Sequence, residues 1–178
     1  FRTADDGVIV DVSDETTLRA QYLVGCDGGR SFVRKAAGIG FPGVDASVSF
    51  IIADAEMTER PVLGVRPAGG GIGPVNPGSD DGPYGIVVRE RRADHTEKPT
   101  LDDLRAELVA SYGTDFGVHS PTRISRFTDM SRQAETYRQD RVLLAGDAAH
   151  IHAPMGGQGL NTGVQDAVNL GWKLAQVV

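Results

Sequence analysis

The chain has 178 residues, of which 40% are hydrophobic and 24% charged, and these values are ordinary for a soluble globular protein with room for one domain or two small ones. The net charge of −6 disfavours nucleic acid as a partner, and no apolar run approaches the roughly 20 residues of a membrane helix. The single cysteine, Cys26, excludes an internal disulfide, and with no signal-peptide pattern after Phe1 we expect a cytoplasmic protein.

The first 25 residues predict consecutive antiparallel strands. A β-branched run from Val8 to Val12 follows a turn at Asp5–Gly7, and residues 17–24 return after a second turn. Cys26 follows directly, and its apolar neighbours predict a buried, inert thiol.

The next motif, YLVGCDGGRSFVRKAAGI, spans residues 22–39. It predicts a strand that ends at Asp27-Gly28 and a helix that Ser31 caps, with Arg34 in the first turns of the helix. A cation and free backbone amides at such a turn suit a phosphate. Taken alone, the motif also describes a plain strand-to-helix turn with a solvated basic face.

Residues 41–135 have the texture of a β-sheet domain. We expect strands over residues 49–57, 62–66, 84–91 and 118–127, and a glycine- and proline-rich, hairpin-like connection over residues 67–78. A helix should begin after the N-cap Thr100 and end near Tyr112. The apolar face of that helix comprises Leu101, Leu104, Leu108 and Val109.

No catalytic base can be named from the sequence. A structural role is the favoured interpretation for each histidine, because the position of each relative to a substrate is unknown. The four histidines are His95, His119, His150 and His152. No spacing of His, Cys, Asp and Glu indicates a metal site, and no nucleophile signature appears.

The most informative stretch is RVLLAGDAAHIHAPMGGQGLNTGVQDAVNLGWK, residues 141–173. A buried strand over residues 142–145 ends at Gly146-Asp147, and a loop with Pro154 and three glycines leads to a helix that begins near Leu160. The apolar residues of this helix fall mostly on one face. They are Leu160, Val164, Ala167, Val168, Leu170, Leu174 and Ala175.

This order of residue types predicts a cofactor site. Asp147 can accept hydrogen bonds from the hydroxyl of a sugar or polyol, because a ligand sits at the carboxyl ends of strands in α/β sheets. The glycine loop allows a flat ring to approach the backbone. The free amides at the helix start favour negative charge in front of them.

The stretch resembles the second FAD-binding motif of the single-component flavin-dependent aromatic hydroxylases, the para-hydroxybenzoate hydroxylase-like monooxygenases, and the earlier Asp27-Gly28 motif resembles their D-G fingerprint. The resemblance implies that the residue at Asp147 holds the ribityl chain and that residues 156–161 lie against the isoalloxazine ring. It also implies that the D-G segment lies near the FAD pyrophosphate and handles NAD(P)H. The implied cofactor-binding residues are Asp27, Gly28, Ser31, Arg34, Gly146, Asp147, Pro154, Gly156, Gly157, Gly159, Leu160 and Asn161.

The resemblance implies an α/β (α+β) fold, in which a partial FAD-binding Rossmann-like domain carries an inserted, mainly antiparallel β-sheet domain that binds the substrate. The FAD-binding part comprises residues 1–40 and 136–178, and the substrate-binding part comprises residues 41–135. No G-x-G-x-x-G loop follows an early strand, so we expect an internal fragment of a longer protein.

The implied reaction is hydroxylation of a small aromatic substrate, closest to the aromatic polyketides, by NAD(P)H, O₂ and FAD through a flavin hydroperoxide. Two alternatives stay open. One is an FAD-dependent halogenase or reductase on the same fold, and the other is a non-catalytic remnant that keeps the fold without the cofactor. The sequence leaves the oligomeric state open.

Overall fold

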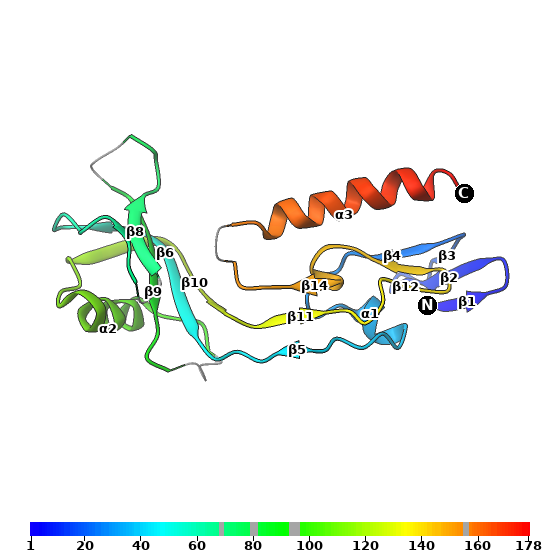
Figure 1. The fold of residues 1–178 in the computed structure, drawn as a ribbon, viewed down its shortest axis with the longest axis horizontal. Coiled ribbons are helices and arrows are strands. Elements are labelled where there is room, and N and C mark those ends of the chain that lie inside the picture. Colours follow the sequence, from blue (N-terminus) through cyan, green and yellow to red (C-terminus); the bar gives the residue numbers. More distant parts are fainter. Residues whose placement is uncertain (68–69, 79–81, 93–96, 155–156) are drawn as a thin grey trace. The chain divides into compact units, whose positions relative to one another are not determined.

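A computed structural model describes residues 1–67, 70–78, 82–92, 97–154 and 157–178 (Figure 1). The chain forms two compact units: unit 1 comprises residues 1–45 and 130–178, and unit 2 comprises residues 46–129. The predicted mixture of helices with mainly antiparallel sheets is confirmed. Among the described residues, no helix is long and apolar enough to cross a membrane.

Unit 1 begins with the predicted antiparallel meander. Its strands are β1 (Arg2–Ala4), β2 (Gly7–Asp11) and β3 (Thr17–Ala20), which pair in that order. The returning strand is shorter than expected, because the chain leaves the meander after Ala20. The next strand, β4 (Leu23–Gly25), belongs to a different sheet.

The strand β4 pairs in parallel with β13 (Val142–Leu144), and β12 (Arg138–Gln139) lies antiparallel on the other side of β13. In this register Gly25 lies opposite Leu144. The carboxyl ends of β4 and β13 therefore meet at one edge of the sheet. The Asp27-Gly28 and Gly146-Asp147 turns, more than a hundred residues apart in the sequence, both follow the strands at this edge.

Gly25 is required where β4 meets the helix α1 (Phe32–Ala36). A Cβ atom at Gly25 would lie 2.8 Å from Cγ1 of Val33 and 3.0 Å from Cδ2 of Leu144, which is closer than carbon atoms approach. The helix ends at Ala37, and the amides of the next two residues donate to the carbonyls of Lys35 and Arg34. The absent side chain thus allows α1 to pack directly on the parallel pair.

A third sheet in unit 1 consists of β5 (Gly43–Val44), β11 (Ser131–Gln133) and β14 (His150–Ile151), with β11 in the middle. Beside it lies the 3₁₀ turn η1 (Gly146–Ala148). The core here is small and rich in alanine, which brings the backbones close together. Its buried members are Ile39, Ala134, Leu144, Ala148 and Ala149.

The helix α3 (Gly159–Leu174) is the long C-terminal helix in Figure 1, and it contacts η1. Every residue of α3 is described, and none is buried. Leu160, Val164 and Val168 are 80%, 52% and 67% exposed. The contacts of α3 with the turn η1 include the carboxylate of Asp166, which accepts a hydrogen bond from the Gly146 amide at 2.8 Å.

Unit 2 is a five-stranded antiparallel sheet with strand order β10-β6-β9-β8-β7. The strands are β6 (Ser49–Met57), β7 (Gly64–Val65), β8 (Gly70–Pro74), β9 (Tyr84–Arg89) and β10 (Val118–Thr128). The expected strand over residues 62–66 shrinks to the two residues of β7. The predicted connection over residues 67–78 is wrong in part, because β8 lies inside it.

One face of this sheet is covered by the helix α2 (Leu101–Tyr112), which has the predicted Thr100 cap. Leu104 and Leu108 are fully buried against the sheet, whereas Val109, expected on the same face, is 50% exposed. The buried residues of the sheet are Ile51, Ala53, Ala55, Ile72, Tyr84, Ile86, Val88 and Val118. Side chains that alternate with these point to the opposite face, where the rings of Phe50 and Phe127 stack 5.1 Å apart.

Candidate cofactor site

The turn after β13 presents a free carboxylate. Gly146 has a φ of +61°, a left-handed conformation that glycine adopts readily, and η1 begins there. Asp147 is exposed, and its side chain has no hydrogen bond or ion pair with any described residue. The turn therefore leaves both carboxylate oxygens of Asp147 available to a ligand.

The carboxylate of Asp27, at the neighbouring turn, is already engaged. It accepts hydrogen bonds from the Ser31 hydroxyl at 2.5 Å and from the amides of Phe32 and Val33 at 2.7 and 3.1 Å. Desolvation opposes its ionisation, but the hydrogen bonds, led by the one from Ser31, outweigh it and hold the pKa of Asp27 below its usual value. Asp27 and the predicted N-cap Ser31 thus fix the start of α1.

Arg34 is a buried link between the two motifs. It is 3% exposed, and its guanidinium donates to the carbonyl oxygens of Ala148 at 2.9 Å and Gly29 at 3.0 Å. The same group lies 3.6 Å above the ring of Phe41, and burial lowers its pKa. The solvated basic face considered for this helix is therefore wrong for Arg34, whose cation ties α1 to η1.

A pocket of about 590 Å³ lies where the two turns meet the start of α3. It brings together five of the predicted cofactor-binding residues: Gly28, Gly146, Asp147, Gly159 and Leu160. The sequence did not identify the other residues of its lining, which are Cys26, Ala145, Gly163, Val164 and Ala167. The expectation that Cys26 is buried is wrong, since its side chain is exposed at this pocket beyond the end of β4.

The remaining predicted residues lie outside this lining. Asp27, Ser31 and Arg34 support it from behind through the contacts described above. Pro154 and Asn161 are exposed, and the amide of Gly157 donates to the carbonyl of Pro154 at 3.0 Å. Gly156 lies outside the described residues.

The start of α3 is open toward a ligand. No described side chain caps the first turn of this helix, although Gly159 and Leu160 line the pocket. Unbonded amides at a helix start carry partial positive charge, which attracts an anion or an electron-rich ring edge. The glycines of the lining let a ligand approach the backbone. A free carboxylate, uncapped amides and bare backbone together fit the flavin dinucleotide that the sequence predicts.

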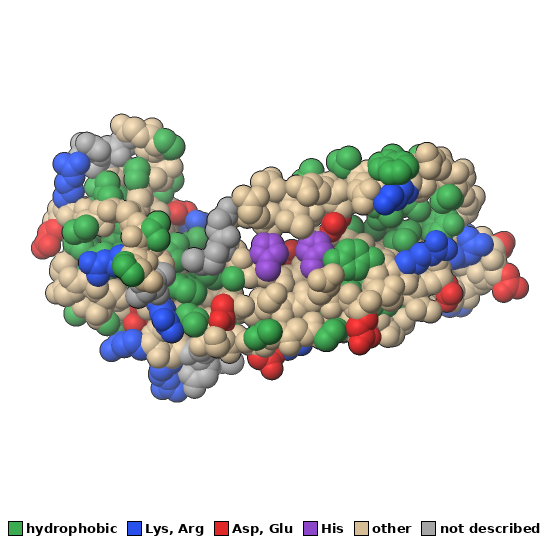
Figure 2. Space-filling view, in the orientation of Figure 1, with side chains coloured by type: hydrophobic (Ala, Val, Ile, Leu, Met, Phe, Trp, Pro, Cys, Tyr) green, Lys and Arg blue, Asp and Glu red, His purple; other side chains and the backbone are tan. Residues whose placement is uncertain are grey.

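Histidines in unit 1 gather near this site, as Figure 2 shows on one face. The Nε2 atom of His150 lies 2.6 Å from Oδ2 of Asp166, and the ring of Tyr137 stacks on the His150 ring at 6.0 Å. His152 is exposed and contacts the carbonyl of Ala153. His119 lies in β10 beside Ser120, and His95 lies outside the described residues.

Among the described residues, no group of His, Cys, Asp and Glu side chains could hold a metal ion. Asp166, whose carboxylate binds the amide of Gly146, was not among the residues predicted for the site. Its position inside an amphipathic helix could have indicated a hydrogen-bond partner, because a carboxylate on the packed side of a helix requires one.

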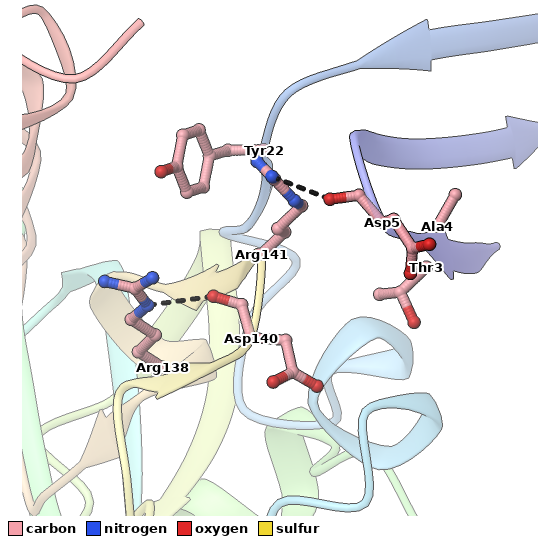
Figure 3. Close-up of a pocket in the computed structure, with 7 residues that line it drawn as sticks. All are labelled: Thr3, Ala4, Asp5, Tyr22, Arg138, Asp140 and Arg141. Atoms are coloured by element: carbon pink, nitrogen blue, oxygen red, sulfur yellow. Dashed lines mark hydrogen bonds between the residues drawn. The ribbon is translucent and has the colours of Figure 1, made fainter.

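A second pocket of unit 1, of about 430 Å³, lies at the opposite edge of the parallel pair (Figure 3). Its lining comprises Thr3, Ala4, Asp5, Tyr22, Arg138, Asp140 and Arg141. Tyr22 and Arg141 directly precede β4 and β13, so this pocket lies at the amino ends of the strands. Arg138 and Arg141 donate to the carbonyls of Asp140 at 2.8 Å and Asp5 at 2.9 Å. These bonds stabilise the chain, and none of the predicted site residues lies here.

Comparison with known proteins agrees with a flavin site. A family model described as FAD binding domain matches residues 3–178. Rifampicin monooxygenase from Streptomyces venezuelae is 52% identical over 186 residues, in a match that covers 100% of this chain and 39% of that protein. The chain therefore spans about two-fifths of the length of this curated relative.

Solved structures of other proteins also match this chain. The anhydrotetracycline hydroxylase OxyS from Streptomyces rimosus has a TM-score of 0.78 and 45% identity, and the match covers 97% of this chain and 36% of that one. Aklavinone-11 hydroxylase, solved in a ternary complex with FAD and aklavinone, has a TM-score of 0.72 and 32% identity. That match covers 99% of this chain and 36% of that one.

Proposed function

This chain belongs to the FAD binding domain family, and from that membership we propose that the whole protein is an FAD- and NAD(P)H-dependent monooxygenase that hydroxylates an aromatic, polyketide-like substrate. The predicted resemblance to flavin-dependent aromatic hydroxylases is confirmed by the relatives, which are named as monooxygenases and hydroxylases. The observation that carries the proposal is the pocket in which both turns and the start of α3 converge.

Residues in the pocket and behind it have distinct roles in this proposal. The free carboxylate of Asp147 accepts a hydrogen bond from a ribityl hydroxyl of FAD. Gly28, Gly146 and Gly159 let the cofactor lie against the backbone, and the amides at the start of α3 stabilise negative charge on its ring. Asp27 and Arg34 hold the two turns at the separation that the cofactor needs.

FAD, when bound, supplies the redox chemistry: it is reduced by NAD(P)H and activates O₂ for transfer of one oxygen atom to the substrate. The protein then contributes orientation, exclusion of water and electrostatic stabilisation. This division of labour requires no side-chain nucleophile.

Unit 2 offers a surface for the aromatic substrate on the sheet face opposite α2. Ile52 and Val87 are half-buried in the middle of this face, between the stacked pair of Phe50 and Phe127 and a row of smaller residues. The row places Gly73 opposite Gly85 and Gly85 opposite Asp54. The apolar part of this floor suits a fused aromatic ring system, and the ion pair of Asp54 with Arg123 lies beside it.

The names of the relatives favour oxygen transfer over halogenation or simple reduction. Rifampicin monooxygenase and the anhydrotetracycline hydroxylase are both named for transfer of oxygen to an organic compound. The same names, together with the match to an FAD binding domain, disfavour a remnant without cofactor.

The test is FAD binding by the full-length protein with Asp147→Asn. The substitution removes the charge that strengthens the hydrogen bond to the ribityl hydroxyl, so we expect the Kd of FAD, measured by quenching of flavin fluorescence, to rise roughly 10- to 100-fold. Asp6→Asn, at an exposed residue away from the pocket, is the matched control and should bind normally. Equal affinity in the two variants contradicts the assignment. NAD(P)H oxidation and product analysis with aromatic substrates then test the reaction itself.

A further inference from the structure

Asp166 of α3 holds the turn that carries Asp147. Its Oδ2 atom accepts a hydrogen bond from the amide of Gly146 at 2.8 Å and lies 2.6 Å from Nε2 of His150. The Asp166 and His150 side chains are only 23% and 15% exposed. One oxygen atom thus joins the backbone immediately before Asp147 to a side chain three residues after it.

The packing around this carboxylate allows the contact. Gly163, about one helical turn before Asp166, faces Gly146, and a Cβ atom at Gly163 would lie 3.6 Å from the Gly146 Cα, an ordinary van der Waals distance. The helix α3 therefore lies directly against the turn, where the Asp166 carboxylate reaches the Gly146 amide.

The same turn is anchored from its other side. Arg34 donates to the carbonyl of Ala148 at 2.9 Å, and the amide of Ala134 donates to the carbonyl of Ala149 at 2.7 Å. The backbone on both sides of Asp147 is therefore fixed by α1, by the segment after β11 and by α3, whereas the Asp147 side chain binds none of the described residues.

We propose that Asp166 is a positioning residue for Asp147, and that His150 holds the Asp166 carboxylate in place. By fixing the Gly146 peptide, Asp166 keeps the Asp147 carboxylate at the pocket before a ligand arrives, so that binding needs no reorganisation of the turn. The inference rests on the proposed function, since it assigns to Asp166 a role that acts through the FAD-binding Asp147.

A merely structural role for Asp166, as an attachment point for α3, makes a different prediction. A residue that acts through Asp147 has no effect once Asp147 is disabled, whereas a residue that stabilises the site independently keeps its effect. A double-mutant cycle separates the two, because residues that act on one interaction give non-additive changes.

The experiment measures the Kd of FAD for the full-length protein with Asp166→Asn, with Asp147→Asn and with both substitutions. Asp166→Asn preserves the shape of the side chain but removes the negative charge that faces the Gly146 amide and the His150 ring. We expect FAD binding to weaken roughly tenfold. The double variant should bind like Asp147→Asn alone. Gln165→Ala, at an exposed neighbour on α3, is the control and should bind normally.

The outcomes are distinguishable. If Asp147→Asn weakens binding while Asp166→Asn does not, or if the two losses multiply in the double variant, the positioning role is wrong and the proposed function stands. If Asp147→Asn leaves the affinity unchanged, both proposals fail. Should Asp166→Asn not fold by circular dichroism, His150→Phe takes its place, because it removes the Nε2 atom that lies against Asp166, keeps a ring beside Tyr137 and leaves Asp166 intact. It should weaken FAD binding by a smaller factor, again only when Asp147 is present.

Discussion

Two aspartates of unit 1 have opposite environments. Asp27 and Asp147 each follow a parallel strand, yet the first accepts three hydrogen bonds within α1 and the second accepts none from the described residues. A carboxylate whose oxygens already have donors stabilises the fold, and one without donors is available for binding. The pairing of the two turns therefore divides support and recognition between similar side chains.

Asp129 gives a pH-dependent prediction. The Ser47 hydroxyl, followed by the amides of Val48 and Ser47, lowers the pKa of this half-buried residue from 3.8 to about 2. Because the folded pKa is depressed, the stabilisation is fully present above pH 3.8 and disappears as the pH falls toward about 2.

We therefore expect Asp129→Asn to lower the urea concentration at which unit 2 is half unfolded at neutral pH. The stability of the variant should also depend less on pH between 3.8 and about 2 than that of the wild type. Denaturant titrations of wild type and variant, followed by circular dichroism at several acidic pH values, measure this. If stability falls equally steeply with pH in both proteins within that pH range, the proposed role of Asp129 is wrong. Asp6→Asn, an exposed acid in unit 1, is the control.

Whether a residue's role could be predicted depended on how far away its partner lies. Ser31 and Thr100 were predicted as caps because each bonds an amide three residues later. Arg34 bonds a carbonyl 114 residues away, and its burial was invisible in the sequence. Asp147 was predicted from its position after an apolar strand, whereas the contact from Asp166 required knowing that α3 folds back onto the turn.

At the scale of the element, β8 shows why a glycine-rich stretch can form a strand. Gly70 has a φ of +89°, and a Cβ atom there would lie 2.4 Å from the carbonyl oxygen of Val87. Ile72 is 2% exposed and anchors the segment in the core. Glycine normally weakens strands, so the sequence predicted a connection here. A single buried isoleucine and close pairing with β9 outweigh that tendency.

The glycine row also predicts a change in specificity. A side chain at Gly85 would have only ordinary contacts, at 3.7 Å or more, and would stand on the sheet face proposed for the substrate. We expect Gly85→Val to leave the melting temperature nearly unchanged and to raise the KM for a polycyclic aromatic substrate roughly tenfold, because the floor is no longer flat.

Steady-state kinetics with a polycyclic and a monocyclic substrate measure this effect. The monocyclic substrate serves as the comparison, since a small ring can avoid the new methyl groups. An equal rise in KM for both substrates, or no rise for either, would place the substrate elsewhere.

At the scale of the whole molecule, unit 2 is built to fold by itself. Its buried cluster extends from Ile51 to Val118, inside one continuous segment. Its two ends are joined, because Asp129 binds Ser47 and the amide of Asp129 donates to the carbonyl of Val48 at 3.1 Å. Unit 1, in contrast, is assembled from residues on both sides of that segment, with β4 and β13 as neighbours.

We expect residues 46–129 alone to unfold in a single cooperative transition, with a stability on the order of 5 kcal/mol. Urea denaturation followed by circular dichroism and by tyrosine fluorescence measures this, and coincident transitions are the expected result. Residues 1–45 alone, which lack β13, provide the comparison and should not fold cooperatively. A non-cooperative transition for residues 46–129 would show that unit 2 depends on unit 1.

The exposed side of α3 has an optical consequence. Trp172, the single tryptophan of the chain, is 53% exposed on the same helix whose first residue lines the cofactor pocket. Thirteen residues of helix separate the indole from Gly159, or about 20 Å at 1.5 Å per residue. Flavins absorb where an indole emits, so excitation energy should pass from Trp172 to a bound flavin. The emission of Trp172 can therefore report occupancy of the pocket in real time, without a label and without turnover.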